Sequence, residues 1–484
     1  LSVLRFSHAF CLIVYEKKVV LSTPTAWILI LISFVFCFIY AIIMEIVLSC
    51  NYKDAEQLRK GVNSAYGILQ AEGVYELANL VLGELPSDNT WDEVPANDNG
   101  NYGQLDLFSM TSANTIIDKA WSHHYKGIQQ CNVILNRVDG IADMAETEKT
   151  NIKGEMCFLR GLMYFNLVRI FGDVQLVIKE TTNPNDFFGQ VRTPKEEVYK
   201  QIVQDLTDAF AMLPDAPAEK GKAAKGAAAA LLGKVYLTLK DYDNSLKYLQ
   251  EVEKFGYALL DEPADIFDVN NKGNKEVIFD VQFESGVNGN SEGSRAFQKF
   301  SPSGTVSGAL GHNLPTKEVY GLFADNDKRK SAYFIVTKNG VIGTGKLKQT
   351  SATVADGGSN VIVLRYADVL LMLAECYAEK DNVSKSNEYL NLIKKRAGIE
   401  EVSIGDVTLI KEEIALERRK ELVNEGHRWF DLIRTGKAVE VMNAYFTRTP
   451  GYTGITISEL NYVQPIPQGQ IDTDSATKQN EGYN

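Results

Sequence analysis

The sequence predicts a mainly α-helical fold in which tetratricopeptide-like helical hairpins pack against a loop-rich region with a few short strands. From Tyr52 onward, apolar residues recur at three- and four-residue spacing in many stretches, which is the pattern of amphipathic helices. Short polar turns such as Lys240-Asp241 join consecutive stretches. The segment 284–360 is instead rich in Gly, Ser and Asn, so we expect loops there. Alternating apolar residues in 276–283 predict a strand just before it.

Two segments that are far apart in the chain share one spacing pattern. The pentapeptides 232–236 and 373–377 each end in a tyrosine, and a small residue, Ser245 or Ser386, follows each tyrosine after nine positions. Small residues let two helices approach closely, and larger residues then fill the gap between hairpins. The pattern therefore predicts tetratricopeptide-like pairs around two ranges, 227–255 and 365–397.

The composition excludes some classes of function. The chain of 484 residues has a formal net charge of −12, whereas nucleic-acid binding requires clustered Lys and Arg. An acidic surface is compatible with a neutral sugar or a peptide, and less so with a polyanion. No CxxC or HExxH pattern occurs, so the sequence predicts no metal site and no cofactor. Three cysteines lie among apolar neighbours and are expected to be buried small apolar side chains: Cys131, Cys157 and Cys376.

The first fifty residues predict export or membrane attachment. An apolar run, 26–44, follows two lysines and precedes Glu45 and Cys50. In one interpretation this is a signal peptide with a lipobox, and Cys50 is lipidated and becomes the mature N-terminus. In the other, the run is a transmembrane helix, because ~20 apolar residues suffice to span a bilayer. A misplaced start is a further alternative, because the sequence does not begin with Met. We favour the first interpretation, with a signal or anchor segment, 1–50, before a binding domain, 51–484.

Two polar loop regions carry the candidate ligand-binding residues. The first, 86–103, combines flat aromatic faces with amides and carboxylates: Asp88, Asn89, Trp91, Asn97 and Tyr102. The second lies within 284–360 and offers Phe297, Phe300 and His312. Sugar rings stack their C–H faces on aromatic side chains and form hydrogen bonds with Asn and Asp, and a peptide can use the same groups. Binding residues commonly lie on loops held by a rigid scaffold. The alternative is an ordinary polar surface loop in which Asp88 and Asn89 cap a turn.

Acidic residues near the C-terminus do not form an evident catalytic pair. Glu417, Glu421 and Glu425 recur every four residues on one helix face and alternate with arginines, which is typical of ion pairs within and between helices. A glycosidase needs two carboxylates on either side of the scissile bond, and no such pairing is evident. Asp431 is interpreted in the same way, and His427 and Trp429 as packing and positioning groups. The sequence therefore predicts no catalytic residue.

Three acidic residues of the first loop could hold a hard cation, but no EF-hand pattern accompanies them: Asp92, Glu93 and Asp98.

Several motifs occur in one order along the chain. Residues 417–432 read ERRKELVNEGHRWFDL, and this segment strongly resembles the ERR-x-EL-x-x-EG-x-R-x-x-DL signature of the SusD/RagB family. The other segments that resemble family motifs are FLRGLMYF at 158–165 with FGDV at 171–174, NLPTKE at 313–318 with DKR at 327–329, LRYADVLL at 364–371, VQPIPQ at 463–468 and QNEGY at 479–483. Together they cover roughly residues 52–484.

The resemblance implies a non-enzymatic cell-surface lipoprotein of Gram-negative bacteria. Such a protein caps a SusC-like TonB-dependent barrel in the outer membrane and delivers glycans or peptides to it. Family members usually carry a tether after the lipidated cysteine, whereas residues 51–56 already resemble the first helix. Two other functions are weighed against this one: a membrane-anchored tetratricopeptide scaffold that binds protein partners, and an enzyme on a helical scaffold.

Overall fold

Helices dominate the computed structural model, which describes residues 52–183, 185–186, 188–287, 289 and 292–483. The predicted mainly α-helical fold class is confirmed. The apolar run 26–44 and the lipidation candidate Cys50 lie outside the described residues. Within the described ranges, no helix has both the length and the apolar character needed to cross a membrane. Residues 54–484 form one unit by their internal contacts.

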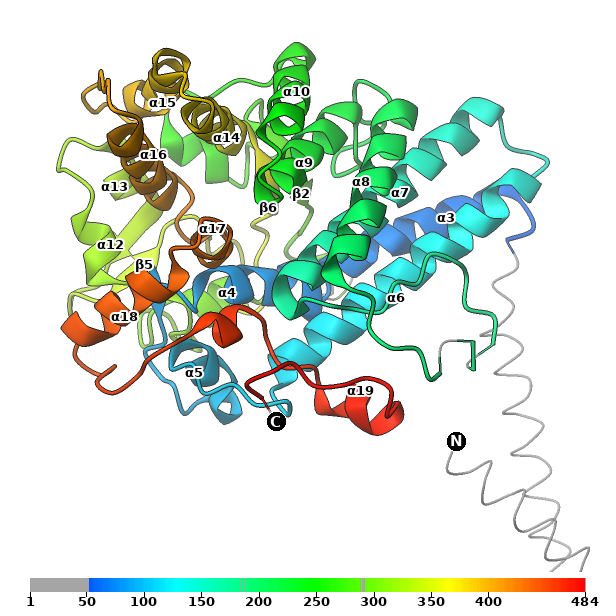
Figure 1. Cartoon of the computed structure of the whole chain (residues 1–484), viewed down its shortest axis with the longest axis horizontal. Helices are drawn as coiled ribbons and strands as arrows, with labels where there is room; N and C mark the ends of the chain where they lie inside the picture. Colours follow the sequence, from blue (N-terminus) through cyan, green and yellow to red (C-terminus); the bar gives the residue numbers. More distant parts are fainter. Residues whose placement is uncertain (1–51, 184, 187, 288, 290–291, 484) are drawn as a thin grey trace, which may run out of the picture. The chain divides into compact units, whose positions relative to one another are not determined.

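The helices and strands follow one another along the chain as drawn in Figure 1. The helices are α3 (Ala55–Gly67), α4 (Ala78–Glu84), α5 (Asn101–Asp106), α6 (Thr115–Arg137), α7 (Glu146–Phe171), α8 (Lys195–Met212), α9 (Lys225–Thr238), α10 (Tyr242–Val252), α11 (Ala296–Phe300), α12 (Lys317–Gly321), α13 (Lys328–Tyr333), α14 (Tyr366–Glu379), α15 (Val383–Arg396), α16 (Val407–Glu421), α17 (Arg428–Arg434), α18 (Ala438–Arg448) and α19 (Gln468–Thr473). The strands are β1 (Thr90–Trp91), β2 (Val277–Val281), β3 (Leu314–Pro315), β4 (Phe334–Val336), β5 (Ile342–Thr344) and β6 (Val361–Arg365).

Helix α7 lies at the centre of the N-terminal helices. It packs between α6 and α8, and α8 packs in turn against α9 (Figure 1). From Met156 to Phe171 every residue of α7 is buried except Arg169, as expected for a helix that has neighbours on all sides. A buried Arg160 donates two hydrogen bonds to Asp205 of α8, at 2.8 and 2.7 Å, and so fixes the two helices together.

The two predicted helical hairpins are confirmed as α9 with α10 and α14 with α15. In the first, the Ser245 hydroxyl donates a hydrogen bond of 2.8 Å to the carbonyl of Gly233. In the second, Ser386 donates one of 2.7 Å to Ala374 in the equivalent position. These small residues allow the paired helices to approach closely. A pair of stacked tyrosines crosses each hairpin, with ring centroids 5.7 Å apart in both: Tyr236 with Tyr248, and Tyr377 with Tyr389.

The loop-rich region 284–360 contains more regular structure than its composition suggests. It includes α11, α12, α13 and the strands β3, β4 and β5. Two of these short helices begin at side-chain caps, because Thr316 accepts a hydrogen bond from Val319 N and Asp327 accepts one from Arg329 N. The strand predicted at 276–283 forms β2, which pairs antiparallel with β6.

A buried network of charged side chains joins α13, α15, α16, β6 and the ends of neighbouring segments. It contains five cations and five carboxylates, and each of these side chains is at most 9% exposed: Arg329, Lys346, Arg365, Arg396 and Lys420 with Glu276, Asp327, Glu417, Glu421 and Glu425. Burying unpaired charges is very unfavourable, so the equal numbers of the two signs are a condition for this core to exist.

Glu421 is the centre of this network. Its carboxylate accepts hydrogen bonds from Arg329 at 2.9 Å and Arg365 at 2.6 Å, and it also binds Arg396. The Tyr333 hydroxyl donates a further bond of 3.1 Å. Burial opposes ionisation of this carboxyl, but the three guanidinium groups outweigh burial and hold the pKa of Glu421 well below its ordinary value.

The other acidic residues of the motif are held in the same way. Glu425 accepts hydrogen bonds from Arg365 and Lys346 at 2.7 and 2.5 Å, and Glu417 binds Arg329. Asp431 forms ion pairs with two arginines of α16 and α17, Arg418 and Arg434. The interpretation of these carboxylates as ion-pair partners is therefore confirmed.

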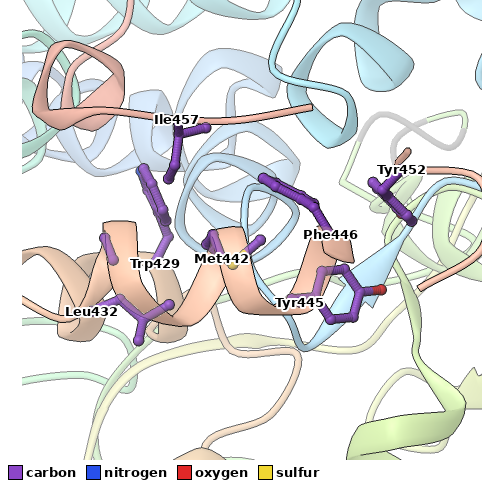
Figure 2. Close-up of a cluster of buried hydrophobic side chains, with 8 residues drawn as sticks. Trp429, Leu432, Met442, Tyr445, Phe446, Tyr452 and Ile457 are labelled. Atoms are coloured by element: carbon purple, nitrogen blue, oxygen red, sulfur yellow. The ribbon is translucent and has the colours of Figure 1, made fainter. Parts of the chain in front are cut away.

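The C-terminal helices α17 and α18 enclose a separate aromatic cluster. Figure 2 shows its labelled members from α17, α18 and the segment after α18: Trp429, Leu432, Met442, Tyr445, Phe446, Tyr452 and Ile457. Phe108, which follows α5, contacts Trp429 and Phe446 edge-on, with ring centroids 5.5 and 5.6 Å away. The cluster thus attaches the N-terminal loop region to the C-terminal helices, and the expected packing role of Trp429 is confirmed. The cysteines Cys131, Cys157 and Cys376 are buried and free, also as expected.

The charge network yields a stability prediction. Replacing Glu421→Gln removes the negative charge between three buried arginines, and we expect it to lower the free energy of unfolding by about 3–5 kcal/mol. Chemical denaturation of both proteins measures the difference. The matched control is Glu412→Gln, on an exposed position of the same helix, which should change stability by less than about 0.5 kcal/mol. Equal stabilities for the two variants would contradict the central role of Glu421.

Candidate ligand-binding site

The two loop regions that were predicted separately form one surface structure. Strand β1 of the first loop pairs antiparallel with β3 of the second, with Thr90 opposite Pro315 and Trp91 opposite Leu314. Beyond this short sheet, Glu93 N donates a hydrogen bond of 3.0 Å to the carbonyl of Gly311. Segments more than two hundred residues apart are therefore joined by backbone hydrogen bonds.

The buried side chain of His312, in the second loop, joins this loop to the first. Its side chain is fully buried, and its Nδ1 and Nε2 atoms lie 2.9 Å from Asp92 and 3.1 Å from Asp98. The imidazole stacks on Tyr102, with ring centroids 4.0 Å apart and planes within 10°. The ammonium of Lys299 forms an ion pair of 2.5 Å with Asp98. Five side chains, two of them predicted and three their neighbours, thus form one base beneath the loop surface.

The tip of the first loop adopts an uncommon backbone conformation. Asp98, Asn99 and Gly100 have φ values of 49°, 57° and 73°, so three consecutive residues lie in the left-handed region. Such a conformation costs residues other than glycine some stability, although Asp and Asn adopt it more readily than most, and it is found preferentially at functional sites. Here the contacts of Asp98 with Lys299 and His312 hold it. Burial opposes ionisation of Asp98, but these two groups outweigh burial and lower its pKa.

Asp88 and Asn89 lie inside the protein instead of on the loop surface. Each is 1% exposed. Asp88 accepts two hydrogen bonds from Arg428, at 2.8 and 3.1 Å, and forms an ion pair of 2.9 Å with Arg419. Burial opposes ionisation of Asp88, but the two arginines outweigh burial and lower its pKa. Asn89 bonds to Arg419 and to Glu84, both at 2.8 Å. These two residues attach the loop to α16 and α17.

The turn-capping role weighed for Asp88 and Asn89 belongs to their neighbour. The Ser87 hydroxyl accepts a hydrogen bond of 3.3 Å from Asn89 N and donates one to the carbonyl of Glu84. The carboxylate and amide of the two predicted residues are used in tertiary contacts, for which the local sequence contains no signal.

The remaining predicted residues divide into a base and a rim. Tyr102, Phe300 and His312 are at most 4% exposed and belong to the base. Trp91 and Phe297 are half-buried, and Asn97 is exposed. The rim therefore presents aromatic surface and an amide to solvent. Phe297 lies in the first turn of α11. Arg295, just before this helix, anchors it through ion pairs with Glu72 and Glu76.

The acidic residues of the first loop are all engaged by protein groups. Asp92 contacts His312, Asp98 contacts His312 and Lys299, and Glu93 accepts a hydrogen bond of 2.8 Å from Ser303 N. Among the described residues, no cluster of three or more His, Cys, Asp or Glu side chains could hold a metal ion.

Two residues that sequence reasoning missed are important for the geometry. Lys299 holds the strained tip, and Arg428 holds Asp88. The only sequence signal for Arg428 is its place in the 417–432 motif, and Lys299 has no recognisable signal.

Comparisons with known proteins cover nearly the whole chain. Residues 324–483 match a family model described as "SusD family", and residues 53–237 match one described as "Starch-binding associating with outer membrane". "SusD-like protein P25" of Formosa agariphila is 26% identical over 90% of this chain and 92% of its own length.

Solved structures show the same similarity. A "Laminarin binding SusD-like protein" is 27% identical, with a TM-score of 0.77 over 89% of this chain and 100% of that one. A SusD superfamily protein from Parabacteroides distasonis is 26% identical, with a TM-score of 0.77 over 88% of this chain and 99% of that one. Surface glycan-binding protein A of Bacteroides thetaiotaomicron, in complex with laminarihexaose, shares the fold at 24% identity and a TM-score of 0.76, over 88% of this chain and 100% of that one.

A buried carboxyl beneath the loops gives a pH prediction. Burial raises the pKa of Asp106 from 3.8 to about 7, although Asp92 N and the Tyr452 hydroxyl both donate hydrogen bonds to it. Because the folded-state pKa is raised, the stability linked to protonated Asp106 is fully present below pH 3.8 and is lost as pH rises to about 7.

We therefore expect Asp106→Asn to gain about 3 kcal/mol relative to wild type between about pH 5 and about pH 8. Denaturant unfolding at both pH values measures this shift. Any loss of the Asp92 hydrogen bond in the variant adds an offset that does not depend on pH. The exposed Asp261→Asn variant is the control. A pH-independent difference for Asp106→Asn would show that the buried carboxyl does not titrate in this range.

Proposed function

Because the chain belongs to the SusD/RagB family, we propose that it captures an oligosaccharide or polysaccharide at the cell surface and delivers it to a SusC-like TonB-dependent transporter. The observation that carries the glycan assignment is the joined loop surface. Its predicted residues include the half-buried aromatic side chains of Trp91 and Phe297 and the exposed amide of Asn97. Aromatic faces and an amide are the groups that a sugar ring uses for stacking and hydrogen bonding.

The rigidity of the base supports this assignment. His312 joins the two loops through Asp92 and Asp98, and Tyr102 stacks on its ring. Binding residues on a pre-formed surface lose little conformational entropy when the ligand arrives. The loops can therefore hold a flexible oligosaccharide without a large ordering cost of their own.

Similarity to the laminarin-binding protein supports a glycan over a peptide. That protein aligns with this chain over its full length at 27% identity. Laminarin oligosaccharides are accordingly the first ligands to test, and peptides are the alternative class in the same assay.

We propose binding without catalysis. Hydrolysis of a glycosidic bond requires two carboxyl groups at a defined separation across the bond. The four acidic residues of the 417–432 segment are held by buried arginines and lysines, so they are not free to act as such a pair: Glu417, Glu421, Glu425 and Asp431. A bound oligosaccharide should be recovered intact.

The first binding prediction concerns Trp91. In purified residues 51–484, Trp91→Ala should weaken binding of a laminarin oligosaccharide at least about tenfold, because an aromatic anchor at the rim is lost. Isothermal titration calorimetry measures the affinity, and chromatography of the ligand before and after incubation tests for turnover.

The matched control is Phe188→Ala, which removes an aromatic side chain that is 49% exposed and lies outside both loops. It should leave the affinity unchanged. Equal affinities for wild type and Trp91→Ala would remove Trp91 from the site, and degradation of the ligand would contradict a purely binding function. If the protein binds peptides but no glycan, the ligand of this site is a peptide and the glycan assignment is wrong.

The membrane attachment is a separate proposal. Cys50 is the proposed lipidation site, and the family model matched by residues 53–237 is described as associating with the outer membrane. The wild-type protein should incorporate labelled palmitate and be accessible to surface proteolysis on intact cells, and Cys50→Ser should do neither. Labelling that persists in Cys50→Ser would place the anchor elsewhere.

Loss of ligand uptake on deleting the gene, with binding by the purified protein intact, would support the transporter partnership.

A further inference from the structure

A cavity lies away from the predicted loop residues. It has a volume of about 1180 Å³ and is lined mainly by residues of α7, α8, α9 and α17 and of the segment 462–480. Helices α7, α8 and α9, which contribute to its lining, pack side by side (Figure 1). Lysine and arginine side chains outnumber carboxylates in its lining by seven to three, although the chain as a whole has a net charge of −12. The cavity is therefore a cationic site within an acidic protein.

Arg169 is the arginine of this cavity that lacks a counter-ion. It is the residue of the second half of α7 that is not buried. Its guanidinium carbon lies 4.0 Å from the centroid of the Phe165 ring and 4.3 Å from that of Phe430. Its Nε and Nη2 atoms donate hydrogen bonds to the Phe165 carbonyl and to Asn166. In the described part of the chain Arg169 forms no ion pair with a carboxylate.

The other arginines of the lining contrast with Arg169. Arg418 is paired with Asp368 at 2.8 Å and with Asp431 at 3.1 Å. Arg434 is paired with Asp431 at 2.8 Å and with Glu375. Arg169 itself contacts aromatic faces and neutral hydrogen-bond acceptors, and although Asp431 and Asp368 act on it from a distance, burial outweighs them and lowers its pKa. An anion that entered the cavity would supply the missing partner.

Lys234 and His427 extend the polar side of the cavity beside Arg169. The Lys234 ammonium lies 3.0 Å from Asp368 and 3.1 Å from His427 Nδ1. Burial, together with the charge of Lys234, lowers the pKa of His427 to about 3, so the imidazole is neutral. Since Nδ1 accepts from the ammonium, the proton of the neutral ring is assigned to Nε2. Phe430 and Tyr199 supply aromatic surface in the same lining.

We propose that this cavity binds an anionic sugar whose carboxylate or sulfate group pairs with Arg169. Its volume suits a mono- to trisaccharide rather than a polymer. The guanidinium fork matches a planar or tetrahedral oxyanion, and the aromatic surface matches the sugar ring. Two exposed lysines at the lining, Lys195 and Lys240, form no ion pair within the described residues and would attract the ligand electrostatically. The sugar part of this inference rests on the proposed glycan-binding function.

The test uses glucuronate, glucose 6-sulfate and glucose as probes in isothermal titration calorimetry. At least one anionic sugar should bind at least about tenfold more tightly than glucose, and added salt should weaken this binding. Preference for glucuronate identifies a carboxylate ligand, and preference for glucose 6-sulfate a sulfate ligand. Equal binding of glucose, or no saturable binding of either anionic sugar, would overturn the proposal.

Variants locate the binding. Arg169→Gln should weaken it at least about tenfold and Arg169→Lys less, whereas the exposed Arg59→Gln should have no effect. If Arg169→Gln does not fold, as its melting temperature will show, the double variant Lys195→Gln with Lys240→Gln should weaken binding and reduce its salt dependence. Unchanged affinity in a folded Arg169→Gln protein, or in the double variant, would overturn the assignment.

The two sites can fail independently. Trp91→Ala should leave binding of the anionic sugar unchanged, and Arg169→Gln should leave laminarin-oligosaccharide binding unchanged. If anionic sugars bind but laminarin oligosaccharides do not, the proposed function of the loop surface fails and the cavity assignment stands. The reverse result overturns the cavity assignment alone.

Discussion

The structure depends on the compensation of charge around Glu421. Three arginines from α13, β6 and α15 converge on this one carboxylate, and each of their side chains is at most 3% exposed: Arg329, Arg365 and Arg396. Each arginine comes from a different part of the chain, so the ion pairs fix how the second hairpin, the strand pair and α13 are placed around α16. Hydrophobic packing alone tolerates small shifts of one helix against another, whereas a hydrogen-bonded charge pair in a dry interior requires a narrow geometry.

The loop surface is held by the continuation of the same segment. After α16 ends, the Glu84 carboxylate accepts hydrogen bonds from the backbone of Asn424, Gly426 and His427. Arg419 and Arg428 then reach Asp88. The stretch 417–432 therefore has two structural roles. Its glutamates pair with the buried arginines of the core, and Arg419 and Arg428 position the first loop. Ion pairs therefore hold the first loop in place, whereas the side chains proposed to meet the ligand, Trp91, Phe297 and Asn97, carry no charge.

The sequence predicted well what depends on neighbours in the chain. Helix periodicity and the small residues Ser245 and Ser386 predicted the two hairpins, because the interacting residues lie within one helical pair. The ion-pair role of Glu421 was also predicted, although its arginine partners could not be, since they are separated from it by 25 to 92 residues. Asp88 and Asn89 were expected at the surface because they lie in a polar, Pro- and Asn-rich stretch; distant arginines bury them. The net negative charge likewise gave no indication of the cationic cavity, because a sum over all residues does not show where charges gather.

The pairing of β1 with β3 and of Asp88 with Arg428 also determines when the site can exist. A chain that is still being synthesised can fold its helical hairpins as soon as each has emerged, because their contacts are local. The loop surface cannot close until α17 is available. A protein cut short before Arg428 would keep recognisable repeats and lose the ion pair that attaches the first loop to α17. Formation of the loop surface thus requires that the chain be complete at least as far as α17, although both loops lie earlier in the sequence.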